Sequence, residues 1–316
     1  MTILSGVLAT PFPAFAGENG AAAFPPCANP GWRPSGHGVK DHTVFWYNGY
    51  YYLASINVPN ETYFAYARST DLCTWEDLGP ILAGRTPGGW DELVIWGPFV
   101  YQENGVYYMV YTGVTGQFTQ SIMLATSENP ADPASWQPQG MIFQPSHPGM
   151  VWLSGSWADC RDPMLVKIGS IYYLYYTGLD EAGGIVGLAT ATSLSGEWRD
   201  WGAIDPTALN AMQESPTLAQ YQDAYYLFYH LAGKGEFFRI GPGPDGPWSQ
   251  PYEFNPGWAH EVWKTPDGSW FTSYLTDYSV SIAPLNWDDF YDPPRPAVGE
   301  KTYHQILPLI SFYAPN

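Results

Sequence analysis

The stretch Gly169-Ser170-Ile171-Tyr172-Tyr173-Leu174 decides the fold, because it has relatives along the whole chain. The other copies are Gly49-Tyr50-Tyr51-Tyr52-Leu53, Gly105-Val106-Tyr107-Tyr108-Met109, Ala224-Tyr225-Tyr226-Leu227 and, more weakly, Gly268-Ser269-Trp270-Phe271. They are separated by roughly 40 to 65 residues, and a repeat of about this length is the sequence signature of a propeller or a solenoid.

Each copy belongs to a unit of four short strands. An apolar run and a turn such as Asn48-Gly49, Asn104-Gly105 or Asp267-Gly268 precede the aromatic strand. These dipeptides favour the tight turn of a β-hairpin, so the apolar run and the aromatic strand are predicted to pair. In the first three copies a third apolar run follows, at residues 64–70, 122–127 and 186–191. A tryptophan then opens a fourth run, at Trp75, Trp136, Trp198 and Trp248.

Four antiparallel strands repeated five times predict an all-β fold, a five-bladed β-propeller. We expect the blades at about residues 41–82, 91–143, 161–204, 214–253 and 259–291, within a single catalytic domain that covers residues 17–316. No long segment has the period of an α-helix, so no helical fold competes with this interpretation.

The composition excludes several classes of partner. The net charge is −18 with only 12 Lys and Arg residues, whereas nucleic acids are bound by basic side chains that neutralise phosphates. An anionic membrane surface is disfavoured for the same reason, and no run of 18 or more apolar residues predicts a membrane span. The 15 Trp and 24 Tyr residues suit a neutral sugar, although most of them are expected to pack between blades.

The N-terminal segment resembles the end of a secretory signal. Residues 3–9 are mostly apolar, and Ala14-Phe15-Ala16 offers small residues for cleavage after Ala16. The positively charged start of a signal is missing, so residues 1–16 are interpreted as a truncated signal peptide. The chain is therefore predicted to be secreted, into the periplasm or the medium, and we expect it to act as a monomer.

Chemistry-bearing residues precede the aromatic strands at a nearly constant distance. Asp41 lies ten residues before Tyr51, Asp162 ten before Tyr172, and Glu214 eleven before Tyr225. His260 and Trp96 occupy the corresponding places in the other two blades. Because the inner strands of a propeller surround one axis, these five residues are predicted to share one equivalent position and to converge on a central pocket.

Three converging carboxylates indicate acid–base chemistry. Like charges and partial burial separate the pKa values of such groups, so that one holds a proton while another is ionised. Cleavage of a glycosidic bond needs this division of labour. Arg161, beside Asp162, is predicted to keep that carboxylate ionised or to bind a substrate hydroxyl.

The motif Arg161-Asp162-Pro163, followed by Tyr172-Tyr173-Leu174-Tyr175-Tyr176-Thr177-Gly178, resembles the third-blade signature of the five-bladed glycoside hydrolases of families 43 and 32 and the related families 62 and 68. The similarity covers about residues 35–290. It implies that Asp41 is the general base or the nucleophile and that Glu214 is the general acid. Asp162 would orient the substrate and tune the pKa of the acid, or stabilise the transition state.

The same resemblance implies further contacts. His260 matches a channel histidine that in many family 43 members helps to hold calcium. The resemblance therefore allows a structural calcium ion in the central channel, and it implies that the reaction needs no cofactor. From their positions, Trp96, His42 and Trp157 are predicted to contact substrate together with Arg161 and His260. Two motifs depart from family 32, namely Lys40-Asp41-His42 and Glu214-Ser215.

The sequence therefore predicts a glycoside hydrolase that cleaves a terminal arabinofuranosyl, fructofuranosyl or xylosyl linkage of an oligo- or polysaccharide. Two alternatives stay open on the same fold. One is an enzyme that transfers the sugar to another sugar, and the other is a propeller that binds carbohydrate without catalysis.

Overall fold

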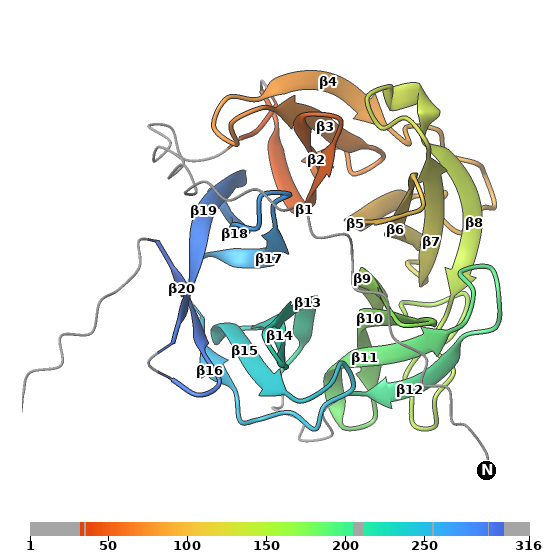
Figure 1. The fold of residues 1–316 in the computed structure, drawn as a ribbon. Helices are drawn as coiled ribbons and strands as arrows, with labels where there is room; N and C mark the ends of the chain where they lie inside the picture. Colours follow the sequence, from red (N-terminus) through yellow and green to blue (C-terminus); the bar gives the residue numbers. More distant parts are fainter. Residues whose placement is uncertain (1–31, 35, 205–210, 255, 290, 300–316) are drawn as a thin grey trace, which may run out of the picture.

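Five four-stranded antiparallel sheets form a ring around a central axis in the computed structural model of the chain (Figure 1). The structure describes residues 32–34, 36–204, 211–254, 256–289 and 291–299. In each sheet the four strands follow one another in sequence order, and the first strand of each blade, β1, β5, β9, β13 or β17, faces the axis. The predicted five-bladed β-propeller is confirmed.

The strands of the first three blades are β1 (Gly38–Tyr47), β2 (Tyr50–Val58), β3 (Phe64–Ser69) and β4 (Glu76–Ile81); β5 (Val94–Glu103), β6 (Val106–Val114), β7 (Gln120–Ser127) and β8 (Gln137–Phe143); and β9 (Cys160–Ile168), β10 (Ile171–Asp180), β11 (Gly183–Ala191) and β12 (Arg199–Ala203). Those of the last two are β13 (Gln213–Tyr221), β14 (Ala224–Leu231), β15 (Gly235–Gly241) and β16 (Tyr252–Glu253); and β17 (Trp258–Lys264), β18 (Trp270–Thr276), β19 (Ser279–Asp288) and β20 (Arg295–Val298). The only helical turn among the described residues is Pro133–Ser135.

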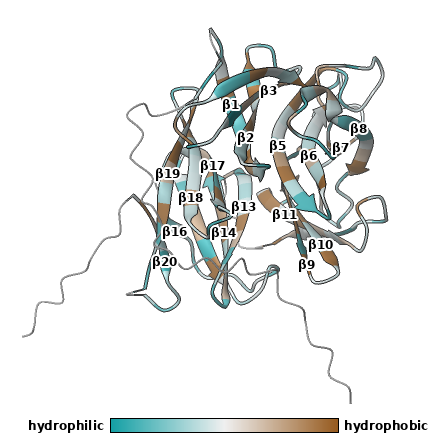
Figure 2. Cartoon of the chain, turned by 45° about the horizontal axis from the view of Figure 1, so that its top comes forward, coloured by the Kyte–Doolittle hydropathy of each residue, from teal (hydrophilic) through white to brown (hydrophobic). Residues whose placement is uncertain are grey.

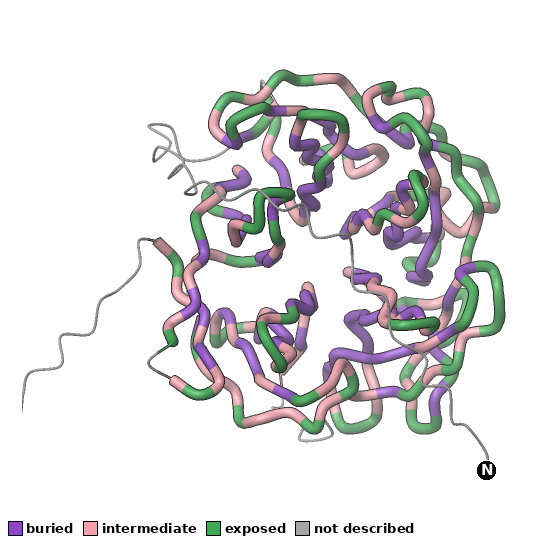
Figure 3. The backbone as a smooth tube through the Cα atoms, viewed as in Figure 1, coloured by how far each residue is buried: buried purple, intermediate pink, exposed green. Residues whose placement is uncertain are grey.

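Hydrophobic packing lies between neighbouring blades. Each of the five buried clusters joins two adjacent sheets, for example Tyr52 of β2 with Tyr107 of β6, and Tyr226 of β14 with Trp287 of β19. The repeated tyrosines therefore pack between blades, as the sequence predicts. In Figures 2 and 3 hydrophobic and buried residues follow the strands, and exposed residues gather in the connecting loops.

Residues before the first blade help to close the ring. Trp32 exchanges two backbone hydrogen bonds with Val280 of β19, at 2.7 and 2.9 Å, and Val39 donates to the carbonyl of Tyr278 at 2.9 Å. The predicted signal peptide, residues 1–16, lies outside the described residues. None of the described residues forms a helix with the length and apolar character needed to cross a bilayer.

The tryptophans that open the fourth strands lie where the sequence predicts in three blades. β4 follows Trp75, β8 follows Trp136 and β12 follows Trp198 directly. In the fourth blade the strand after Trp248 shrinks to the two residues Tyr252–Glu253, which pair with Phe237 and Phe238.

Candidate active site

Every inner strand carries a β-bulge near its start. The register between the first and second strand shifts at Lys40/His42, Trp96/Phe99, Glu214/Thr217 and Trp258/Glu261, and opposite Tyr175/Thr177 in the third blade. Four of the residues inside these bulges, Gly97, Asp162, Ser215 and Ala259, have φ between 49° and 53°. Such left-handed backbone at non-glycine residues is costly and concentrates at functional sites.

The bulges correct the predicted register. Asp41, Gly97, Asp162, Ser215 and Ala259 are the equivalent residues. Glu214 and Trp96 lie one position earlier, and His260 one position later. The prediction of one shared position is therefore wrong for these three, because counting back from the aromatic strands does not detect an offset of one residue within a bulge.

This offset separates two compartments. The residues directly before the bulge all line a wide pocket of about 290 Å³, here called the outer pocket; they are Lys40, Trp96, Arg161, Glu214 and Trp258. The residues directly after it line a smaller space of about 30 Å³, here called the inner cavity; they are His42, Pro98, Pro163, Pro216 and His260. Asp41 and Asp162 belong to both spaces and separate them.

The outer pocket brings the three predicted carboxylates together around Arg161. Its guanidinium donates to Glu214 Oε1 at 2.7 Å, forms an ion pair with Asp159, and lies 3.8 Å from Asp162 Oδ2. Although burial opposes it, these acids raise the pKa of Arg161. One buried cation therefore balances part of the negative charge of the pocket.

Asp162 is fixed by its neighbours in the next strands and blades. Thr177 Oγ1 donates to its Oδ2 at 3.0 Å, the backbone N–H of Ser215 at 3.3 Å, and its own N–H donates to Thr112 Oγ1 at 3.1 Å. The chain approaches Gly97 so closely that a Cβ there would lie 2.9 Å from Asp162 Cα. The position therefore requires glycine, and Asp162 is held in a rigid frame.

Asp41 and Asp162 bind protons more tightly than isolated acids. Burial raises the pKa of Asp41 to about 8, and the negative charges of Asp162 and Glu214 add to the rise. Burial also raises the pKa of Asp162, although Arg161 opposes the change. At neutral pH Asp41 therefore keeps its proton, as expected for like charges that share a partly desolvated site.

A second charged group forms the opposite wall of the outer pocket. Lys40 Nζ lies 2.6 Å from Glu61 Oε1, and Trp96 Nε1 donates to Glu61 Oε2 at 2.7 Å. Glu61 therefore fixes the orientation of the Trp96 ring. At the rim, Trp157 is 60% exposed and stacks on Phe118 with ring centroids 5.5 Å apart.

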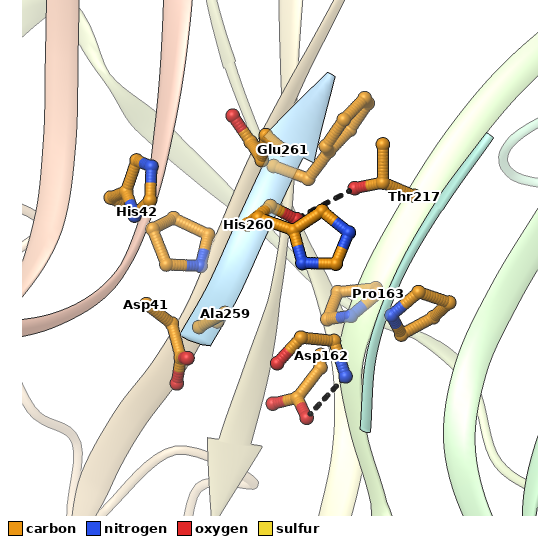
Figure 4. A pocket seen from close by; sticks show the side chains of 13 residues that line it. Asp41, His42, Asp162, Pro163, Thr217, Ala259, His260 and Glu261 are labelled. Atoms are coloured by element: carbon orange, nitrogen blue, oxygen red, sulfur yellow. Dashed lines mark hydrogen bonds between the residues drawn. The ribbon is translucent and has the colours of Figure 1, made fainter. Parts of the chain in front are cut away.

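Two histidines, three prolines and the carboxyl groups of Asp41, Asp162 and Glu261 are among the residues that line the inner cavity (Figure 4). In this view Asp41 and Asp162 lie at one end with Ala259 between them, and His42 and His260 lie further along the cavity. Burial, and then the nearby His260, lower the pKa of His42 to about 3, so that His42 is neutral. Its two ring nitrogens and His260 Nε2 are buried without a hydrogen-bond partner.

Glu236 of β15 connects the two compartments. Its carboxylate accepts from His230 Nδ1 at 2.6 Å and from His260 Nδ1 at 2.7 Å. His230 lines the outer pocket and pairs with Glu214 across the β13–β14 ladder. Hydrogen bonding to Glu236 raises the pKa of His230, although burial opposes the rise.

The predicted calcium ion is not confirmed. Within the ranges that the structure describes, no group of three His, Cys, Asp or Glu side chains converges as metal ligands. The lining of the cavity offers oxygen from Asp41, Asp162 and Glu261 as well as imidazole nitrogen, but among the described residues these groups do not gather around one point as ligands. His260 is also engaged through Nδ1 by Glu236.

The structure places the predicted substrate contacts in different spaces. Arg161, Trp96 and Trp157 line the outer pocket, and His42 and His260 line the inner cavity. The reasoning from sequence missed Glu61, His230 and Glu236. Glu61 lies in a turn, His230 in the second strand of its blade and Glu236 in the third, and the count along the first strands does not reach them.

Residues 36–152 match the profile of the family described as Glycosyl hydrolases family 43. The chain is a five-bladed propeller that resembles this family. Two Aspergillus niger proteins, "Arabinan endo-1,5-alpha-L-arabinosidase A" and its probable counterpart from a named strain, are each 29% identical to it over 160 residues, or 49% of this chain and 46% of theirs. The chain thus spans about half the length of the curated relatives it matches.

Solved structures share the fold over nearly the whole chain. A thermostable family-43 glycoside hydrolase is 20% identical with a TM-score of 0.62, covering 84% of this chain and 94% of that one. An exo-1,5-α-L-arabinanase from a bovine ruminal metagenomic library is 19% identical with a TM-score of 0.61, covering 83% and 97%. A GH43_1 enzyme from Xanthomonas citri complexed with xylotriose is 18% identical with a TM-score of 0.63, covering 84% of this chain and 91% of that one.

Proposed function

We propose that the chain is a glycoside hydrolase that acts on arabinose- or xylose-type saccharides. The observation that carries the proposal is the convergence of Asp41, Asp162 and Glu214 around one buried arginine in the outer pocket. Pure sugar binding needs no set of partly protonated acids, whereas glycosidic cleavage needs an acid and a base together. The resemblance to family 43 supports the same reaction class.

The three acids have different surroundings, which supports different roles. Glu214 is more exposed than Asp162, with 31% of its side chain accessible against 9%, and it lines the outer pocket beside Arg161. We assign it the role of general acid. Asp41 lines the same pocket and is assigned the role of base or nucleophile. Asp162, fixed by Thr177 and Ser215, orients substrate and tunes its neighbours.

The sugar is a terminal arabinofuranosyl, fructofuranosyl or xylosyl unit in this proposal. The names of the relatives and neighbours include arabinanases and a xylotriose complex, which favours arabinose and xylose over fructose. The outer pocket is lined by residues from all five blades of one chain, so a monomer would be sufficient for activity.

A screen of aryl arabinofuranosides, fructosides and xylosides, with linear arabinan and xylan, tests the proposal. Release of one monosaccharide is expected, together with a fall of about 10²–10⁴-fold in kcat for Asp41→Asn and for Glu214→Gln. Their circular dichroism spectra should match that of the parent. Near-normal turnover in either variant would remove that residue from the mechanism, and longer oligosaccharides among the products would indicate sugar transfer instead.

A further inference from the structure

The second and third blades carry equivalent grooves. Both are lined by residues of the second, third and fourth strands, which lie outside the first strand that faces the axis. The groove on the third blade has a volume of about 410 Å³ and lies over strands β10, β11 and β12. Its lining includes Tyr173, Leu188, Thr190, Trp201 and Asp245. It shares no lining residue with the outer pocket or the inner cavity. The corresponding groove on the second blade is lined by Tyr108, Leu124, Thr126, Gln139 and Met141.

The strand ladders align the two grooves residue by residue. Thr126 pairs with Gln137 as Thr190 pairs with Arg199, and a bulge follows in both fourth strands. Gln139 and Trp201 are therefore equivalent. Each donates a side-chain N–H to the threonine of the third strand: Gln139 Nε2 to Thr126 Oγ1 at 3.0 Å, and Trp201 Nε1 to Thr190 Oγ1 at 2.9 Å.

This equivalence shows that the fold does not need a tryptophan at position 201. Glutamine makes the same hydrogen bond in the second blade, and it is exposed there without exposing an apolar ring. Trp201 keeps 51% of its surface exposed. A single exposed ring is common on protein surfaces, but apolar surface that lines a groove together with polar groups is typical of a ligand-binding site.

The indole of Trp201 is fixed in place. The Arg199 guanidinium lies 3.4 Å from the centre of its ring, and the bond to Thr190 holds its edge. Since Arg199 covers one face, the remaining exposed surface offers a flat apolar platform that loses little freedom on binding. The exposed carboxylate of Asp245 and the half-buried Tyr173 border the same groove.

We propose that this groove is a second sugar-binding site, which holds a neutral polysaccharide chain outside the active site. A sugar ring presents C–H groups to an aromatic face and hydroxyl groups to a carboxylate, and the Trp201–Asp245 groove provides both. The net charge of −18 disfavours an anionic polymer, and the arginine at the groove is already stacked on the indole. The identity of the polymer, arabinan or xylan, rests on the proposed function.

The test compares Trp201→Gln with the parent. This variant recreates the residue of the second blade and can keep the bond to Thr190, so the fold is preserved. Retention on insoluble arabinan and xylan is measured by depletion, and kcat/KM is measured with a soluble aryl arabinofuranoside or xyloside. We expect retention about 3- to 10-fold weaker, the range of one aromatic contact, with kcat/KM unchanged. Gln139→Ala, the matched control, should change neither value.

Equal retention of Trp201→Gln and the parent would overturn the inference, as would a parent that binds neither polymer. Sedimentation distinguishes another occupant: a dimer of the parent that Trp201→Gln abolishes would mean that a second copy, and not a sugar, covers the groove. A parent that binds polymer through Trp201 but cleaves no glycoside would leave the second site standing and refute the proposed hydrolase.

Discussion

The outer pocket and the inner cavity are built by the same five bulges, yet they differ in almost every physical property. The outer pocket holds paired charges, Lys40 with Glu61 and Arg161 with Glu214, on side chains that are partly exposed. The lining of the inner cavity includes three prolines, His42 and His260, which are 3% and 1% exposed, and the carboxyl groups of Asp41, Asp162 and Glu261. Glu236 places a further carboxylate behind His260.

The difference shows that each bulge in this propeller places groups with different roles in two compartments along the axis. One residue before each bulge points a functional group to solvent, and one residue after it points a compact group inward. Substitutions before the bulge should therefore change activity, and substitutions around the inner cavity should change stability. Each prediction below tests this division.

Apart from the proposed acid and base themselves, the largest effect is expected for Arg161→Gln in the outer pocket. The change leaves Glu214 and Asp159 without their cation. We expect kcat/KM to fall by about 10²–10³-fold, the loss found when one preorganised electrostatic contact is removed from an active site. Arg161→Lys should restore little, because one ammonium does not contact three acids in the geometry of a guanidinium. Lys167→Gln removes an ion pair with Glu103 outside the pocket and should leave kcat/KM within about twofold. An equal loss in both variants would contradict the assignment.

Glu236→Gln should affect stability more than chemistry. The amide has one oxygen acceptor for two imidazole N–H groups, so one histidine loses its partner in a buried site. We expect the free energy of unfolding to fall by about 1–3 kcal/mol, measured by urea denaturation. The fall in kcat/KM should be smaller than for Arg161→Gln. If activity is lost while the unfolding curve stays unchanged, Glu236 belongs to the chemistry and the division fails.

Asp41→Asn should stabilise the protein at neutral pH while it abolishes turnover. The pKa of Asp41 is raised to about 8 in the folded chain, so between about pH 4 and pH 8 the folded state keeps a proton that the unfolded state has released. The contribution of this group to the free energy of unfolding therefore falls as the pH rises. Asparagine does not titrate, so the variant does not show this fall. The gain should be near zero at pH 4 and should grow toward pH 8 by up to about 1.4 kcal/mol for each pH unit. Asp223→Asn, in an exposed turn, should show no such trend.

The sequence predicts the blades because each strand repeats a local pattern that is also its packing pattern. Tyr52, Tyr107 and Tyr226 are buried between blades, and their Gly- or Asp-containing turns precede them in the chain. The same regularity brings Asp41, Asp162 and Glu214 to one pocket, since strand starts in separate blades must meet near the axis.

The rest depends on contacts across blades, which no local pattern encodes. The bulge that shifts Glu214 by one residue relative to Asp162 is visible only in the pairing with His230. Glu61 accepts a hydrogen bond from Trp96, 35 residues later in the sequence, and Glu236 accepts one from His260, 24 residues later. These pairs join residues of different strands and turns, so their partners become evident only in three dimensions.

The smallest effect is expected at the rim of the outer pocket, for Trp157→Ala. Trp157 is 60% exposed and stacks on Phe118, so its loss should change the free energy of unfolding by no more than about 0.5 kcal/mol. If the ring contacts the sugar chain, KM for an arabino- or xylo-oligosaccharide should rise about 3- to 10-fold, while kcat on an aryl glycoside stays the same. Leu153→Ala, the control at a 69% exposed residue nearby in the chain, should leave both constants unchanged. A loss of kcat in place of a rise in KM would move Trp157 from binding to positioning, because its indole donates to Asp159, the partner of Arg161.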